Sequence, residues 1–129
     1  MSKILTIEDD TSQRKIICEN LIHRGYSVLE AGNGSEGLKI ALREHPDLIL
    51  LDVRMPIMDG MTMMQKLRED AWGKSASIII LTNYDADDKQ ISQITRDMPT
   101  YFLLKVDNPI ERILEKIQEL LESKEIKNQ

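Results

Sequence analysis

Residues 48–60 read LILLDVRMPIMDG, and they decide how the chain folds. Four apolar residues run directly into Asp52, and an Arg-Met-Pro turn and an Asp-Gly pair follow. An apolar run without polar alternation predicts a strand over 47–52 that is buried on both faces, as in parallel sheets. A charge at the end of such a strand is costly unless something there uses it. Asp52 is therefore the first candidate for a functional residue.

The composition is that of a globular protein. Of its residues, 41% are hydrophobic and 30% are charged. The length of 129 residues suits one core and is too short for two ordinary domains. No apolar run approaches the roughly 18 residues of a membrane span, and the start, MSKILTIEDD, lacks a signal-peptide pattern. A single cysteine, Cys18, indicates a reducing compartment, so we expect a cytoplasmic protein. The net charge of −5 argues against direct nucleic-acid binding by this chain.

Short apolar runs alternate with helical patterns along the whole chain. Strands are predicted over 3–8, 26–31, 47–52, 78–82 and 100–104. Helices are predicted over 10–25, 35–45, 61–70 and 86–98, and from 109 to about 122. Five such units predict one α/β domain over 3–122, a parallel sheet with helices on both faces.

Capping residues mark the amino-terminal ends of two of these helices. Ser35 is predicted to cap the second helix, whereas Asn108 is predicted to cap the last helix with Pro109 as its first residue. The polar residues 123–129 are expected to form a fraying tail.

Polar residues follow the strands at their carboxyl ends, where ligands bind in such sheets. They are Glu8-Asp9-Asp10, Asp52, Thr82 and Lys105. Carboxylates that are close together repel one another, and a divalent cation relieves this repulsion; all-oxygen ligands favour Mg²⁺ or Mn²⁺ over zinc. One metal, one hydroxyl and one ammonium group suit a phosphoryl group, with Asp52 as the nucleophile that forms an acyl phosphate.

Together these motifs resemble the receiver domain of two-component response regulators. The acidic doublet after the first strand, LILLDVRMPIMDG, the ILT of the fourth strand and the LLK of the fifth strand carry the resemblance. It covers about residues 3 to 122 and implies a flavodoxin-like (βα)5 three-layer sandwich with strand order 2-1-3-4-5. It also implies a phosphorylation-dependent signalling switch of a phosphorelay, not a turnover enzyme.

The resemblance implies a role for each acidic residue. Asp52 would accept the phosphoryl group from a phosphohistidine on a sensor kinase or a phosphotransfer protein. Asp9 would bind Mg²⁺ directly, Glu8 would bind it through water, and Arg54 would bind it through its backbone carbonyl. Asp10 lies just past the usual acidic pair and is expected to begin the helix.

The phosphoryl group and the output surface are assigned in the same way. Thr82 and Lys105 would bind the phosphoryl oxygens, and Phe102 matches the family's aromatic switch position. The helix over 86–98, the strand over 100–104 and the last helix would form the surface for a downstream protein target or a homodimer. No membrane partner is expected.

The chain departs from the family pattern at three places. Val106 replaces the proline that commonly follows the lysine, Asp97-Met98-Pro99 replaces a Gly-Ala turn, and the switch residue is Phe102 where tyrosine is common. A phenylalanine can fill space there but cannot donate a hydrogen bond.

Three alternative functions make different demands on the sequence. A Mg²⁺-dependent aspartyl-phosphate phosphatase would need a second aspartate two residues after Asp52, where Arg54 stands. A flavodoxin-like electron carrier would need a Ser/Thr/Gly-rich phosphate loop in place of the acidic run. A pseudo-receiver would bind partners without taking phosphate, although every acceptor-site residue is present. The natural-looking start and polar end favour a free-standing receiver over the first part of a longer regulator.

Overall fold

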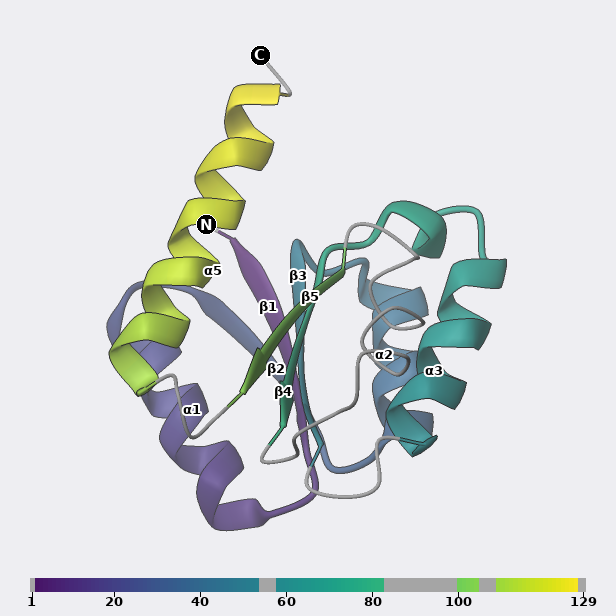
Figure 1. Ribbon diagram of the computed structural model, residues 1–129, viewed down its shortest axis with the longest axis horizontal. Coiled ribbons are helices and arrows are strands. Elements are labelled where there is room, and N and C mark those ends of the chain that lie inside the picture. The colour runs from purple at the N-terminus through teal and green to yellow at the C-terminus, as the bar shows by residue number, and fades with distance from the viewer. Residues whose placement is uncertain (1, 54–57, 83–99, 105–108, 128–129) are drawn as a thin grey trace.

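The computed structural model describes residues 2–53, 58–82, 100–104 and 109–127 (Figure 1). The strands are β1 Lys3–Glu8, β2 Ser27–Ala31, β3 Leu48–Val53, β4 Ile78–Thr82 and β5 Thr100–Leu104. The helices are α1 Thr11–His23, α2 Gly34–Glu44, α3 Met58–Glu69 and α5 Ile110–Lys127, with a short 3-10 helix, η1, at Gly73–Ser75. All five predicted strands are confirmed, whereas the helix predicted over 86–98 lies outside the described residues.

The five strands form one parallel sheet in the order β2-β1-β3-β4-β5, as the resemblance implied. After β1 the chain first adds β2 on one side and then returns to add β3 on the other side. The strand order therefore reverses between β1 and β3, which is where open α/β sheets form their binding crevice.

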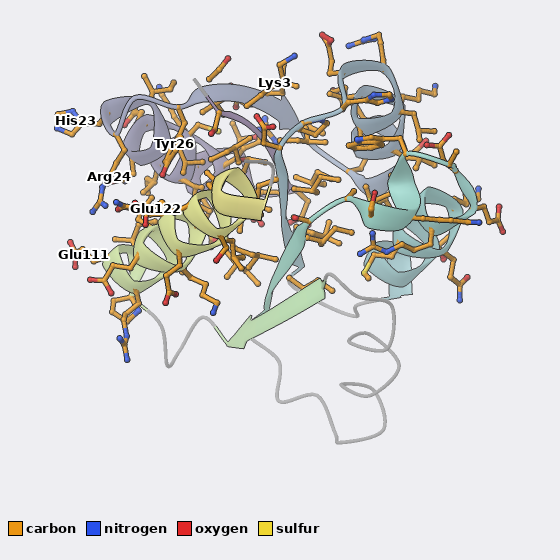
Figure 2. The ribbon with its side chains drawn as sticks, turned by 90° about the horizontal axis from the view of Figure 1, so that it is seen from above. Lys3, His23, Arg24, Tyr26, Glu111 and Glu122 are labelled. Atoms are coloured by element: carbon orange, nitrogen blue, oxygen red, sulfur yellow. The ribbon has the colours of Figure 1, made fainter. Side chains whose placement is uncertain are left out.

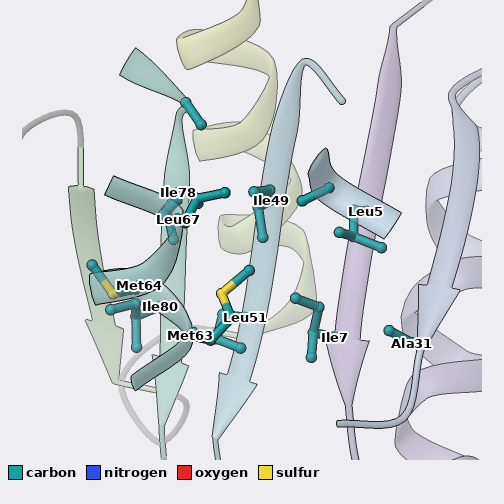
Figure 3. Close-up of a cluster of buried hydrophobic side chains, with 12 residues drawn as sticks. Leu5, Ile7, Ala31, Ile49, Leu51, Met63, Met64, Leu67, Ile78 and Ile80 are labelled. Atoms are coloured by element: carbon teal, nitrogen blue, oxygen red, sulfur yellow. The ribbon is translucent and has the colours of Figure 1, made fainter. Parts of the chain in front are cut away.

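Strand β3 is buried on both faces, as its sequence predicted. Leu48, Ile49 and Leu50 are fully buried and Leu51 is 2% exposed. Alternate side chains enter opposite cores, because successive residues of a strand point to opposite faces. Ile49 and Leu51 pack in the core beneath α2 and α3, which Figure 3 shows from close by. Leu48 and Leu50 pack in the second core beneath α1 and α5, which lie on the other face of the sheet in Figure 1.

Side chains cap the first two helices. Asp10 Oδ1 accepts a hydrogen bond from the Gln13 N–H at 2.9 Å, so Asp10 begins α1 as expected. The prediction of Ser35 as the cap of α2 is wrong, because Asn33 Oδ1 accepts from the Glu36 N–H at 2.8 Å and the helix begins at Gly34. The reason is spacing: a glutamate three residues after the cap completes the usual pattern, and Glu36 stands three after Asn33.

Helix α3 starts earlier than its sequence indicated. It begins at Met58, three residues before the predicted start at residue 61, and therefore includes the Asp-Gly pair at 59–60. Glycine is costly mainly in a helix interior, so Gly60 is tolerated near the start. Met63 and Met64 are buried against the sheet, where they fill the core beneath α2 and α3.

Helix α5 packs on the sheet through one apolar stripe. Its buried residues are Ile113, Leu114, Ile117 and Leu121. The Pro109 carbonyl accepts a hydrogen bond from the Arg112 N–H at 2.9 Å, so Pro109 stands one position before the first helical residue, and Asn108 lies outside the described residues. The helix continues to Lys127, beyond the predicted end near residue 122, and the expected fraying of residues 123–129 stays a prediction. Residues 123–127 contain neither Gly nor Pro, and most of them are good helix formers.

Tyr26 lies in the connection between α1 and β2 and packs against the core beneath α1 and α5. Figure 2 shows it at the same end of the molecule as Arg24 and Glu122 of α5. Burial raises the pKa of the Tyr26 hydroxyl. The charge of Arg24 lowers this pKa by a smaller amount, and the charge of Glu122 raises it. The hydroxyl therefore stays protonated at neutral pH.

Helix α2 lies close to β1 at Gly37. A Cβ atom at this position would overlap Ile7 Cδ1 and lie 2.8 Å from Ile7 Cγ1. Ile7 is almost fully buried, so its side chain has little room to move. We expect Gly37→Ala to lower the free energy of unfolding by about 1–3 kcal/mol, an overpacking cost that exceeds the ~0.5–1 kcal/mol that alanine gains in a helix. Urea denaturation measures this change; exposed Ser35→Ala on the same helix is the control. A stabilised Gly37→Ala would show that the close approach imposes no constraint.

Candidate functional site at the carboxyl edge of the sheet

The strand register brings the predicted acids to one edge of the sheet. Glu8 pairs with Asp52 across the β1–β3 boundary, so the last residue of β1 lies directly beside the predicted nucleophile. Neighbouring strands are about 4.8 Å apart. Val53 pairs with Thr82 on the next strand, and Thr82 pairs with Leu104 of β5. The backbones of Glu8, Asp52 and Thr82 therefore end at the same edge, at the point where the strand order reverses.

Glu8 is a fully buried carboxylic acid. Among the residues whose burial is described, Glu8 and Thr6 are the two buried polar or charged ones. Glu8 Oε1 accepts a hydrogen bond from the Asp10 N–H at 3.1 Å, which ties this acid to the beginning of α1. Burying a carboxylate is costly unless partners or a cation compensate its charge. A fully buried acid beside a second acid on the next strand fits the donor set that Mg²⁺ takes.

Asp9 differs from its neighbours in its exposure. It lies directly after β1, and it is exposed to solvent. Asp10, in contrast, is used as the cap of α1. In the run Glu8-Asp9-Asp10, the first acid is therefore buried, the second is exposed to solvent, and the third caps α1.

The other predicted site residues are described in part or not at all. Phe102 lies in β5 opposite Ile80, and its side chain, like those of Asp52 and Thr82, is not described. Arg54 and Lys105 lie outside the described residues. Within the described side chains, no group of three His, Cys, Asp or Glu residues could hold a metal ion. The ligand set predicted from the sequence also includes Asp52 and the backbone carbonyl of Arg54.

The structure adds one residue that sequence reasoning missed. Arg14 of α1 donates from Nη1 to the Glu8 backbone carbonyl at 2.8 Å. Its Nε donates to Glu30 Oε1 of β2 at 3.3 Å. The available signal was an arginine one turn into the helix that follows the acidic run, because that turn lies over the end of β1.

The cysteine and the histidines are not members of the predicted donor set. Cys18 is buried, and desolvation, aided by Glu30, raises the pKa of its thiol to about 11, so the thiol is protonated at neutral pH. His23 is the last residue of α1. His45 caps the carboxyl end of α2 in a left-handed conformation (φ 47°), and its ring stacks on Trp72 with centroids 4.4 Å apart.

Among the described helices, none has the length and apolar character that a membrane span requires.

The fold and the site define a class of protein. It is a doubly wound parallel α/β domain with one acid on each of the two strands that flank the switch point, Glu8 on β1 and Asp52 on β3. The family model of the response regulator receiver domain matches residues 4–124, and the chain belongs to this family.

Similar proteins support the assignment. The DNA-binding dual master transcriptional regulator RpaA of Synechocystis is 31% identical over 121 residues, 94% of this chain and 49% of the relative. A CheY-like receiver domain protein from Methanospirillum hungatei has a TM-score of 0.82 at 26% identity, covering 98% of both chains. The response regulator TrrA of Thermotoga maritima, solved in complex with Mg²⁺ and BeF, has a TM-score of 0.76 at 29% identity, covering 93% of this chain and 99% of that one.

The chain spans about a third to a half of the length of the first curated relatives that it matches. One of these relatives is named as DNA-binding. The expectation that this chain has no nucleic-acid partner therefore gains no support from them and stays a prediction.

Proposed function

We propose that the chain is a phosphorylation-dependent signalling switch in which Asp52 accepts a phosphoryl group from a phosphohistidine. The observation that carries the proposal is the register that sets the buried Glu8 beside Asp52 at the switch point of the sheet. The donor would be a sensor kinase or a phosphotransfer protein, met in the cytoplasm, as the single cysteine suggests. The domain would be a stoichiometric acceptor and not a turnover enzyme.

Each site residue has one task in this proposal. A carboxylate oxygen of Asp52 forms a bond to phosphorus while the phosphorus–nitrogen bond of the phosphohistidine breaks, and the histidine nitrogen keeps the electron pair. Thr82 donates a hydrogen bond to a phosphoryl oxygen, and Lys105 supplies a point charge.

Mg²⁺ is the cofactor of the proposed site. The residues that would hold it are Asp9, Asp52 and the Arg54 carbonyl, with Glu8 acting through water. The bound ion would neutralise charge on the phosphoryl oxygens during transfer. Support comes from the all-oxygen donor set, from the buried carboxylate of Glu8 and from the Mg²⁺ complex of the similar Thermotoga protein.

Acetyl phosphate with Mg²⁺ tests the proposal, because it supplies a phosphoryl group without a kinase. Intact-protein mass spectrometry should find one added phosphoryl group that decays slowly. A pseudo-receiver would gain no mass. A phosphatase would release inorganic phosphate continuously and accumulate little phosphorylated protein.

We further propose that phosphorylation changes the surface formed by residues 86–98, β5 and α5. The Thr82 hydroxyl would move toward the phosphoryl group, and Phe102 would turn inward into the space that is vacated. Phosphate would shift an existing equilibrium between two conformations. Because Phe102 has no hydroxyl, the inward state gains no hydrogen bond, and the equilibrium should be less biased than in a tyrosine version. The surface would contact a downstream protein or a second copy of the chain.

Amide hydrogen exchange tests this switch. Adding beryllofluoride, a phosphate mimic, with Mg²⁺ should change exchange mainly across residues 83–106. Phe102→Ala should reduce that difference and leave phosphorylation of Asp52 intact. A change confined to α1 and α2, or one that Phe102→Ala does not affect, would contradict the mechanism.

A further inference from the structure

Arg14 connects three parts of the acidic edge. Its Nη1 donates to the Glu8 carbonyl at the end of β1, and its Nε donates to the Glu30 carboxylate on β2. The side chain is only 20% exposed, although it belongs to the second turn of an outer helix. A charge-assisted hydrogen bond from a partly buried guanidinium is stronger than a bond between neutral groups. The guanidinium therefore holds β1, β2 and α1 together at this edge.

The loop after β2 leaves room for this guanidinium. A Cβ atom at Gly32 would lie 3.3 Å from Arg14 Nη1, which is closer than ordinary van der Waals contact. The Gly32 N–H donates to Glu36 Oε2 at 3.3 Å, which ties the loop to the first turn of α2. Arg14 Nη1 is thus placed between the Glu8 carbonyl and the Gly32 backbone.

The carbonyl that Arg14 contacts belongs to the peptide that joins Glu8 to Asp9. Rotation of this peptide would change the directions of the buried acid and of the exposed acid at once. A hydrogen bond that fixes the carbonyl therefore fixes the relative placement of both acids. Outer contacts of this kind, which orient metal ligands, typically account for about 10–100-fold in metal affinity.

We propose that Arg14 is a positioning residue for the divalent-cation site: it orients the Glu8–Asp9 peptide and so increases the affinity for Mg²⁺. This inference rests on the proposed function, because it takes Glu8 and Asp9 as members of the Mg²⁺ site. The charge of Arg14 acts in the opposite direction, since a nearby cation repels Mg²⁺. Geometry and charge thus predict opposite signs for the loss of this residue.

The test measures the Mg²⁺ dissociation constant of the full chain by calorimetric titration, at a temperature where every variant is folded. Arg14→Gln should weaken binding about 10–100-fold. Arg14→Lys keeps the charge, but a single ammonium group cannot contact both the Glu8 carbonyl and Glu30 as the guanidinium does. Its affinity for Mg²⁺ should lie between those of Arg14→Gln and the unsubstituted protein. Gly32→Ala keeps the arginine and crowds its Nη1, and it should weaken binding several-fold. The Mg²⁺ affinity of Gly32→Ala tests the positioning role even if Arg14→Gln fails to fold.

Arg68→Gln is the matched control. Arg68 Nη1 also donates to backbone carbonyls, those of Gly73 at 2.7 Å and Ala76 at 2.8 Å, near the amino end of β4. Its loss should lower thermal stability without changing Mg²⁺ affinity. Unchanged or tighter Mg²⁺ binding in Arg14→Gln would overturn the positioning role. An unsubstituted protein that binds no Mg²⁺ would overturn the proposed metal site and the positioning role together, so the two failures are distinguishable.

Discussion

Asp52→Asn is expected to abolish phosphorylation by acetyl phosphate and by a phosphorylated kinase. The substitution keeps the size of the side chain and removes the carboxylate oxygen that attacks phosphorus. The backbone at this position pairs with Glu8 on one side and Leu81 on the other, and an amide side chain does not disturb that pairing. Mass spectrometry of the intact protein should find no phosphorylated species under conditions that modify the unsubstituted chain.

The control for this variant lies just before the other end of β3. Asp47 precedes the strand, and its Oδ2 accepts a hydrogen bond from the Lys3 N–H at 2.7 Å. Asp47→Asn makes the same chemical change at the amino edge of the sheet, and it should leave phosphorylation intact. A phosphoryl group still gained by Asp52→Asn would place the acceptor at another residue.

Asp9→Ala should remove the stabilisation by Mg²⁺ and prevent phosphoryl transfer. A ligand that binds only the folded state raises the free energy of unfolding by about 2.7 kcal/mol at one hundred times its dissociation constant. The unsubstituted protein should therefore melt at a higher temperature as Mg²⁺ is added. Asp9 is exposed, so its replacement should change the melting temperature little in the absence of the metal.

Thermal melts with and without Mg²⁺ measure this effect. Glu19→Ala removes another exposed acid, on α1, and should keep the full Mg²⁺ response. An Asp9→Ala protein that responds to Mg²⁺ like the unsubstituted one would move the cation site elsewhere in the chain.

Much of the architecture could be predicted because burial leaves a direct mark on sequence. Strand β3 is apolar from Leu48 to Leu51, and β4 from Ile78 to Leu81, since helices cover both of their faces. The position of Glu8 beside Asp52 followed as well, because the carboxyl ends of parallel strands meet at one edge.

Two details of the structure were not predicted, one although its signal stands in the sequence and one because it depends on a backbone contact. Ser35 and Asn33 are both good caps, and the spacing to Glu36 decided between them. The place of Arg14 one turn into α1 was the available signal for its role, but the hydrogen bond to the Glu8 carbonyl is a backbone contact that the sequence does not specify. Lys105 and the helix predicted over 86–98 lie outside the described residues, so those predictions stay predictions.

The strand order has a consequence for how the protein is made. Once β1 and β2 have paired, β3 adds beside β1, β4 adds beside β3, and β5 adds beside β4. No later strand has to be inserted between two earlier ones. A chain leaving the ribosome can therefore add β3, β4 and β5 in the order of synthesis, each beside the outermost strand on the same side of the sheet. Each pairing is parallel and spans a connecting segment, which makes folding slower than in a protein of local hairpins. Until β4 is synthesised, the apolar β3 forms the growing edge, and this is the stage at which a nascent chain most needs protection from aggregation.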